Sequence, residues 1–323
     1  MFRKVLTFAT VKPKTRTMKI SFLTLAIFLS IPLFSQERFI TVDSTKIWIN
    51  TVGIENRQEG QPVIVFESGY GTPMGHWDRI LEGVSDLAPL ITYDRPGIGE
   101  SEADDEMPTI KNVSDKLIKI LNHLEINPPY ILVGHSLGGA YVRGFAVYYP
   151  ELLAGLVIID PADFTETQKN KRLNFKELGI EDNTIDALLA KFEQENIKNK
   201  EKSTAPKSVQ EEGEVLEHLR KTDFKEITDS ELPNIPVHII TGGRYDTPPR
   251  YRRHEYNDSL MFRAKQKHRV ERWTEVIQSV DKGMLFYSAD AGHFIHYDDP
   301  ELVISSIRIV LQDYEILRTM NEE

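Results

Sequence analysis

The sequence predicts an α/β fold with a mostly parallel central sheet, helices on both faces of that sheet, and a helical cap insertion. Short apolar runs, typical of buried strands, alternate along the chain with stretches of helical periodicity. Such alternation favours a parallel sheet whose two faces are both covered by helices. The strands are expected at residues 39–52 (a strand or hairpin), 62–66, 90–93, 130–133, 156–159, 237–240 and 284–287.

Helices are expected between these strands and after the last one. Ile110, Val113 and Leu117 begin an apolar series at helical spacing that continues to Leu124. The remaining predicted helices cover residues 76–87, 137–149 and 300–317. In a sheet of this kind the functional site lies beyond the carboxyl ends of the strands.

Residues 161–234 form a separate, highly charged segment without a strand-like run. We expect residues 36–160 and 235–323 to form the core and residues 161–234 to form a helical lid. Ile185, Leu188, Leu189 and Phe192 mark one amphipathic helix, and residues 196–207 are expected to be a loop. The segment enters between two strands at their carboxyl ends, so its apolar stripes are predicted to face the substrate. The alternative is a solvated helical insertion.

The N-terminal residues 1–35 are typical of a secretory signal peptide. They contain six basic residues and no acidic one, with an apolar run at residues 20–34 before the small Ser35. We therefore expect a periplasmic or secreted protein that begins near Gln36. The alternative is an uncleaved N-terminal membrane anchor. The chain has no cysteine, so the exported protein must be stable without disulfides.

The charge of the chain argues against several classes of partner. The formal net charge is −10, and because residues 1–35 contribute +6, residues 36–323 carry −16. A strongly acidic surface disfavours nucleic acid and anionic membranes, so neither is expected as a stable partner. The sequence does not indicate an oligomeric state.

A nucleophile motif surrounds Ser136. The sequence Gly134-His135-Ser136-Leu137-Gly138 directly follows one predicted strand and opens a predicted helix. A serine on such a strand–turn–helix element projects its hydroxyl, and the two glycines avoid clashes in the tight turn. The helix N-terminus also favours developing negative charge. Ser136 is therefore the candidate nucleophile.

His293 is the candidate general base. It follows the last predicted strand within Gly292-His293, just before the final helix, and an imidazole titrates near neutral pH. His296 lies three residues further on, but without cysteines or a carboxylate–histidine cluster beside the pair we predict no metal site. No cofactor is expected either.

Two glycine-containing loops follow earlier strands. In the loop Glu67-Ser68-Gly69-Tyr70-Gly71, the backbone N–H of Tyr70 is the candidate first donor of an oxyanion hole, and the N–H of Leu137 is the second. The other loop contains Asp94 and Arg95. We interpret this pair as structural groups that fix the loop below the site.

These motifs resemble, in order, the signatures of the α/β-hydrolase superfamily. The similarity covers residues 39–317 and rests on the glycine-rich loop at 69–71, Asp-Arg-Pro-Gly-x-Gly at 94–99, Gly-His-Ser-Leu-Gly-Gly at 134–139 and Gly-His-Phe at 292–294. It is greatest to serine carboxylesterase-like members. The resemblance implies a Ser–acid–His triad, no cofactor, and a lid between the sixth and seventh strands. One departure is Ser68-Gly69, where many members have His-Gly.

Two aspartates compete for the acid of the triad. Asp246 follows the strand at 237–240, which resembles the usual acid position of the family and gives the chain order Ser136, Asp246, His293. Asp160 ends the strand before the insertion, a position that a minority of relatives use. Both lie beyond carboxyl strand ends, so the sequence does not separate them. We favour Asp246, with Asp160 as the alternative.

The predicted function is that of a serine hydrolase that cleaves a carboxylic ester of a small-molecule acyl substrate through an acyl-enzyme intermediate. A thioesterase or a small-peptide serine aminopeptidase would use the same residues. A protein of another class, a non-catalytic binding or receptor protein on the same fold, is the remaining alternative.

Overall fold

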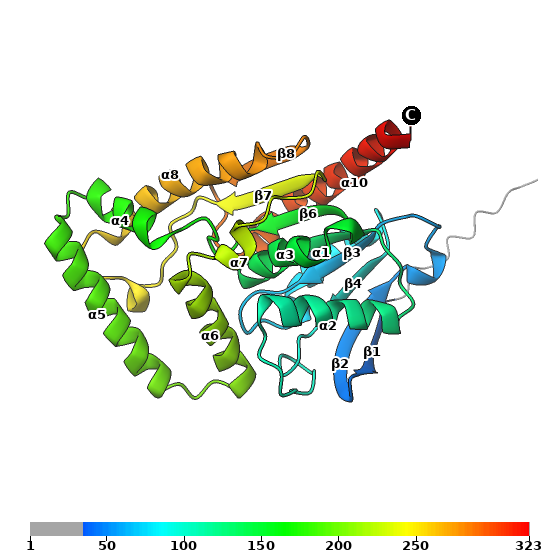
Figure 1. The fold of residues 1–323 in the computed structure, drawn as a ribbon, viewed down its shortest axis with the longest axis horizontal. Helices are drawn as coiled ribbons and strands as arrows, with labels where there is room; N and C mark the ends of the chain where they lie inside the picture. Colours follow the sequence, from blue (N-terminus) through cyan, green and yellow to red (C-terminus); the bar gives the residue numbers. More distant parts are fainter. Residues whose placement is uncertain (1–34, 323) are drawn as a thin grey trace, which may run out of the picture. The chain divides into compact units, whose positions relative to one another are not determined.

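The computed structural model describes residues 35–322, so the predicted signal peptide lies outside the described residues except for Ser35. These residues build one eight-stranded sheet with the order β1-β2-β4-β3-β5-β6-β7-β8 (Figure 1). The strands are β1 (Ser35–Val42), β2 (Thr45–Val52), β3 (Val63–Glu67), β4 (Leu90–Tyr93), β5 (Tyr130–His135), β6 (Leu153–Ile159), β7 (Val237–Gly242) and β8 (Gly283–Ser288).

The strand directions confirm the predicted mostly parallel sheet. β1 and β2 form an antiparallel hairpin, and β2 also runs antiparallel to β4. All later neighbours, from β4 and β3 to β7 and β8, are parallel. The apolar runs identified in the sequence fall on these strands, or on the β1–β2 hairpin for residues 39–52, with Pro62 lying one residue before β3. Strands that are covered on both faces are rich in apolar side chains, which is why such runs mark them.

Helices cover both faces of the sheet, as expected. Successive side chains of a strand point to opposite faces, and in β3 Val63 and Val65 lie in one core cluster while Ile64 and Phe66 lie in the other. The first cluster includes residues of α2 (Ile110–His123) and α3 (Leu137–Tyr148), with Trp273 of α8 (Asp258–Ile277). The second includes residues of α1 (Asp78–Ser85) and α10 (Pro300–Glu322).

The segment between β6 and β7 is helical and lies beyond the carboxyl ends of the strands (Figure 1). It contains α4 (Gln168–Glu177), α5 (Asp182–Glu201), α6 (Lys207–Lys221) and the short α7 (Lys225–Thr228). The loop predicted at residues 196–207 is wrong for its first half, because α5 continues to Glu201. Lysines 198 and 200 lie in the last turn of α5, where positive charge is favourable.

The prediction that the apolar stripes of this segment face a substrate is also wrong. Ile185 and Leu188 of α5 are buried with Phe175 of α4 and Met261 of α8, and Phe192 packs against the same cluster. On α6, Val215 and Leu219 belong to the main core. The stripes therefore hold the helices to one another and to the sheet domain. Among residues 35–322, no helix is long and apolar enough to span a membrane.

Candidate active site

Ser136 lies on a sharp turn between β5 and α3. Its backbone has φ 55° and ψ −116°, a conformation that a residue other than glycine rarely adopts. The turn is tight on both sides: a Cβ atom on Gly134 would lie 2.4 Å from the carbonyl oxygen of Gly138, and one on Gly138 would lie 2.1 Å from that of Glu67. Only glycine fits at these two positions, which is the reason the motif has this spacing.

The side chains of Ser136, His293 and Asp160 form a hydrogen-bonded chain. Nε2 of His293 lies 3.1 Å from Oγ of Ser136, and Nδ1 of His293 lies 2.6 Å from Oδ2 of Asp160. His293 follows β8, and Asp160 follows β6 directly. His293 lies 133 positions after Asp160 and 157 positions after Ser136 in the sequence, yet the three side chains meet at the carboxyl edge of the sheet. This is the geometry of a nucleophile, a base and a group that orients the base.

The preference for Asp246 as the acid is corrected by this geometry. Asp246 has its side chain about half exposed and interacts with Arg244, whose Nη2 lies 3.5 Å from its Oδ2. Arg244 is itself bound to Asp298, with Nη2 2.8 Å from Oδ2. The loop after β7 therefore directs its carboxylate toward an exposed arginine. The Nδ1 side of His293 is already occupied by Asp160.

Asp160 is buried but surrounded by donors. Its Oδ1 lies 3.2 Å from Nη1 of Arg269, 3.2 Å from Oγ1 of Thr241 and 3.4 Å from the backbone nitrogen of Gly242. Burial by itself would raise the pKa of Asp160, but the positive charge of Arg269 and the hydrogen bond from His293 outweigh it and lower that pKa below its usual range. The carboxylate is thus kept ionised where it contacts the imidazole.

Three further histidines lie close to His293. The ring of His135 packs 4.6 Å from that of His293, and its Nε2 lies 2.9 Å from the His293 carbonyl oxygen. Nδ1 of His76 lies 3.1 Å from Nε2 of His296. Burial lowers the pKa of His296 to about 3, and it also lowers the pKa values of His135 and His76. These three rings are therefore uncharged at neutral pH, and they support the His293 loop without adding charge to it.

The loop after β3 lies directly against the nucleophile. A Cβ atom on Gly69 would be 3.3 Å from the Cβ of Ser136. Within residues 35–322, no acceptor is found for the backbone N–H of Tyr70 or for that of Leu137. Leu137 is the first residue of α3, where backbone N–H groups have no partner inside the helix. Both N–H groups named in the sequence analysis are thus available to a bound oxygen.

Two neighbours of the site were missed by sequence reasoning. Arg269 contacts Asp160 from α8, but it lies 109 positions later in the sequence and no motif marks the arginine. Glu212 of α6 binds the loop after β3. A signal for Glu212 did exist: it lies three and seven residues before Val215 and Leu219, so it is a carboxylate on the apolar stripe of its helix. Among the described residues, no group of three or more potential metal ligands is found.

The comparisons with known proteins agree with this fold. The model of the alpha/beta hydrolase family matches residues 64–305. Among solved structures, a thermophilic esterase from Thermogutta terrifontis superimposes with a TM-score of 0.55 and 19% identity, covering 86% of this chain and 99% of that one. At this identity the similarity concerns the fold alone.

Two curated proteins are similar to shorter stretches of the chain. An uncharacterized protein, YqjL, of Bacillus subtilis (strain 168) is 34% identical over 99 residues, which are 31% of this chain and 39% of that protein. The (lyso)-N-acylphosphatidylethanolamine lipase of Mus musculus is 28% identical over 131 residues, 39% of this chain and 38% of the lipase. The matched part of the chain thus spans about two fifths of these two relatives.

Proposed function

The chain belongs to the alpha/beta hydrolase family, and we propose that it is a serine hydrolase that cleaves carboxylic esters through an acyl-enzyme. The observation that carries the proposal is the chain of contacts from Ser136 through His293 to Asp160, with distances of 3.1 and 2.6 Å. The name of a lipase among the similar curated proteins supports an ester as the substrate.

In the first half of the proposed reaction, Oγ of Ser136 attacks the acyl carbonyl carbon while Nε2 of His293 accepts the hydroxyl proton. The carbonyl oxygen becomes an oxyanion, which the N–H groups of Tyr70 and Leu137 stabilise. Collapse of this intermediate breaks the bond to the leaving alcohol. The His293 imidazolium donates this proton to the departing alkoxide, and the acyl group remains on Ser136.

In the second half, a water molecule takes the place of the alcohol. His293 accepts a proton from the water as its oxygen attacks the acyl carbon, and the second intermediate releases the carboxylic acid with return of the proton to Ser136. Asp160 accepts the hydrogen bond from Nδ1–H of His293 throughout. It thereby keeps Nε2 free as the base and stabilises the imidazolium.

The proposal is tested with Ser136→Ala. Wild-type protein is expected to hydrolyse p-nitrophenyl esters and to bind one fluorophosphonate covalently, while the Ser136→Ala variant loses both properties. The expected loss in kcat is on the order of 10⁶-fold, as for other serine nucleophiles. If the variant hydrolyses esters at the wild-type rate, the assignment of Ser136 is wrong. If folded wild-type protein neither turns over nor reacts with the probe, a non-catalytic binding protein becomes the better description.

A further inference from the structure

A buried arginine joins the loop after β3 to the helical insertion. Arg95, in the loop after β4, is almost fully buried between two carboxylates that are also buried. Its Nη1 lies 2.6 Å from Oε1 of Glu67, at the end of β3, and its Nη2 lies 2.7 Å from Oε1 of Glu212, on α6. Burial of this charge is tolerated because both sides of the guanidinium are paired.

The same groups fix the backbone on each side of Tyr70. Nη1 and Nη2 of Arg95 donate to the carbonyl oxygens of Ser68 and Gly69, each at 2.7 Å. The second carboxylate oxygen of Glu212 accepts from the backbone N–H of Gly71 at 2.7 Å. A planar trans peptide holds its C=O and N–H on opposite sides. Binding the Gly69 carbonyl to Arg95 therefore turns the Tyr70 N–H away from Arg95.

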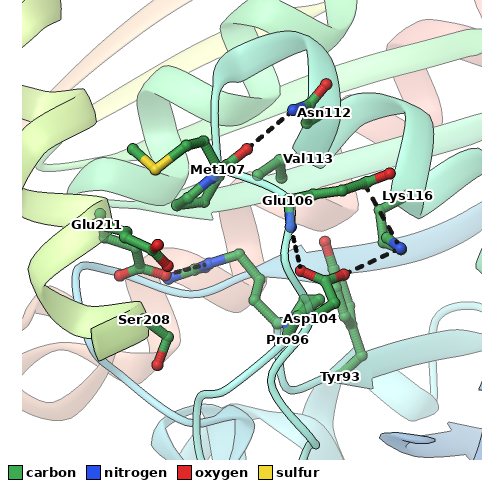
Figure 2. Close-up of a pocket in the computed structure, with 13 residues that line it drawn as sticks. Tyr93, Pro96, Asp104, Glu106, Met107, Asn112, Val113, Lys116, Ser208 and Glu211 are labelled. Carbon is green, nitrogen blue, oxygen red and sulfur yellow. Dashed lines mark hydrogen bonds and ion pairs between the residues drawn. The ribbon is translucent and has the colours of Figure 1, made fainter. Parts of the chain in front are cut away.

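Glu212 is brought to this loop by the docking of α6. Oγ of Ser208, on the first turn of the helix, donates to the Gly97 carbonyl at 2.6 Å. Val209 lies next, where a Cβ atom on Gly71 would be 3.1 Å from its Cγ1. A small pocket separates this end of α6 from the segment 104–116, with Ser208 and Glu211 on the α6 side and Asp104 and Lys116 opposite (Figure 2). Glu212 lines the same pocket and turns its carboxylate to the loop.

We propose that Glu212 is a positioning residue through which α6 completes the oxyanion hole. When α6 is docked, Glu212 holds both Arg95 and the Gly71 N–H, and the Tyr70 N–H points to the oxygen of the acyl group on Ser136. When α6 moves away, Arg95 loses one of its two carboxylates and the loop loses the anchor after Tyr70. The insertion thus controls catalysis through one side chain that does not touch the substrate. This inference rests on the proposed serine hydrolase function.

The test compares Glu212→Gln with Glu214→Gln. In Glu212→Gln an amide NH₂ replaces one of the two oxygens, so it faces either the Arg95 guanidinium or the Gly71 N–H, both of which are donors. The control removes the same charge from the same helix, at a residue whose partner is Lys200 on the surface. We expect Glu212→Gln to lower kcat on the order of 10²-fold with little change in KM, as for other small displacements of catalytic groups. Glu214→Gln is expected to leave both constants unchanged.

A trifluoromethyl ketone inhibitor separates this role from a purely structural one. Its hemiketal oxygen occupies the oxyanion position, so its inhibition constant should rise in Glu212→Gln by the same factor by which kcat/KM falls. A second variant, Glu212→Asp, keeps the charge and with it the pairing of Arg95, but its shorter side chain does not reach both partners. It should fold, as judged by its melting temperature, and show the same kind of kcat loss.

The inference is wrong if folded Glu212→Gln or Glu212→Asp has the wild-type kcat, if only KM changes, or if the inhibition constant stays constant while kcat falls. If Glu212→Gln does not fold, Glu212→Asp decides alone by the same criteria. Wild-type protein is assayed in parallel. Absence of ester hydrolysis and of fluorophosphonate labelling in the wild type would refute the proposed function, and this inference with it. An active wild type with an equally active Glu212→Gln variant would refute the role of Glu212 only.

Discussion

Replacing Asp160 by Asn changes the tautomer of His293, and the structure predicts the direction of the change. Oδ1 of Asp160 faces three donors, namely Arg269, Thr241 and the Gly242 N–H. In Asp160→Asn the amide oxygen should stay on that side, because the Arg269 guanidinium and the Gly242 N–H can only donate and would be left facing an NH₂ group. The NH₂ group is then directed at Nδ1 of His293. Nδ1 becomes the acceptor, so the ring proton moves to Nε2, which faces Ser136.

An Nε2 atom that already carries a proton does not accept one from Ser136. The comparable substitution in a serine protease costs about 10⁴ in kcat, which corresponds to about 5.4 kcal/mol of activation free energy. We expect Asp160→Asn to show a loss of this order while the hydrogen bonds on the Oδ1 side persist. The matched control is Asp246→Asn, because that side chain is about half exposed and pairs with Arg244 at 3.5 Å. It should retain nearly all activity.

The assay is the steady-state hydrolysis of a p-nitrophenyl ester at pH 7, with the fraction of folded enzyme measured by circular dichroism. Both variants are compared with the wild type at equal folded concentration. The reasoning fails if folded Asp160→Asn keeps near-wild-type kcat, or if Asp246→Asn loses as much activity as Asp160→Asn. The second result would mean that Asp246 replaces Asp160 beside His293 during turnover.

Four further predictions concern other parts of the molecule. Arg269→Gln removes the positive charge that lowers the pKa of Asp160, so Asp160 should become protonated at a higher pH and the acid limb of the kcat/KM profile should move to higher pH. Arg269→Lys, which keeps the charge, should move that limb less, and a wild-type profile in Arg269→Gln would contradict this role. Burial lowers the pKa of His238 to about 4, so between pH 6.5 and 4 the unfolded chain binds a proton that the folded protein does not. The free energy of unfolding therefore decreases as the pH is lowered through this range. In His238→Gln the acid-induced loss of unfolding free energy between pH 7 and 4 should be smaller by about 3 kcal/mol, and an unchanged loss in denaturant titrations would exclude this source. Phe192→Ala should lower stability by roughly 2–3 kcal/mol and leave KM unchanged, because the ring packs in the cluster of α4, α5 and α8. A change in KM without a loss of stability would instead indicate that Phe192 contacts the substrate. Intact mass spectrometry of protein from an exporting host should give a chain that starts near Gln36, whereas a mature form that keeps residues 20–34 would indicate an anchor.

Most of the sheet could be predicted because its strands have a simple pattern. Runs such as residues 130–133 and 156–159 are apolar at every position, which is typical of a strand with helices on both faces. The turn at Ser136 could be predicted because glycine is needed on both sides of it. These features depend on neighbours in the sequence, so local patterns suffice to identify them.

Features that depend on distant partners could not be predicted in the same way. The stripe of α5 is amphipathic whether it faces a substrate or a neighbouring helix, and only the structure shows that Leu188 packs with Phe175 and Met261. Asp160 and Asp246 both follow strands of the sheet, and no local pattern states which of them reaches His293. That choice depends on Arg269 and Arg244, which attract the two carboxylates in different directions.

The position of the acid decides what the rest of the site must supply. An acid in the exposed loop after β7 would be solvated by water. Asp160 is buried at the end of β6 between β5 and β7, so without compensation burial would favour its protonated form, which is a poor partner for an imidazolium. Arg269 supplies that compensation from α8, and the guanidinium is held in place by the Pro161 carbonyl at 2.7 Å and by the ring of Trp273. The helix after β7 thereby becomes part of the proposed catalytic site, and a search for relatives with this acid position should look for a cation on that helix rather than for a carboxylate after β7.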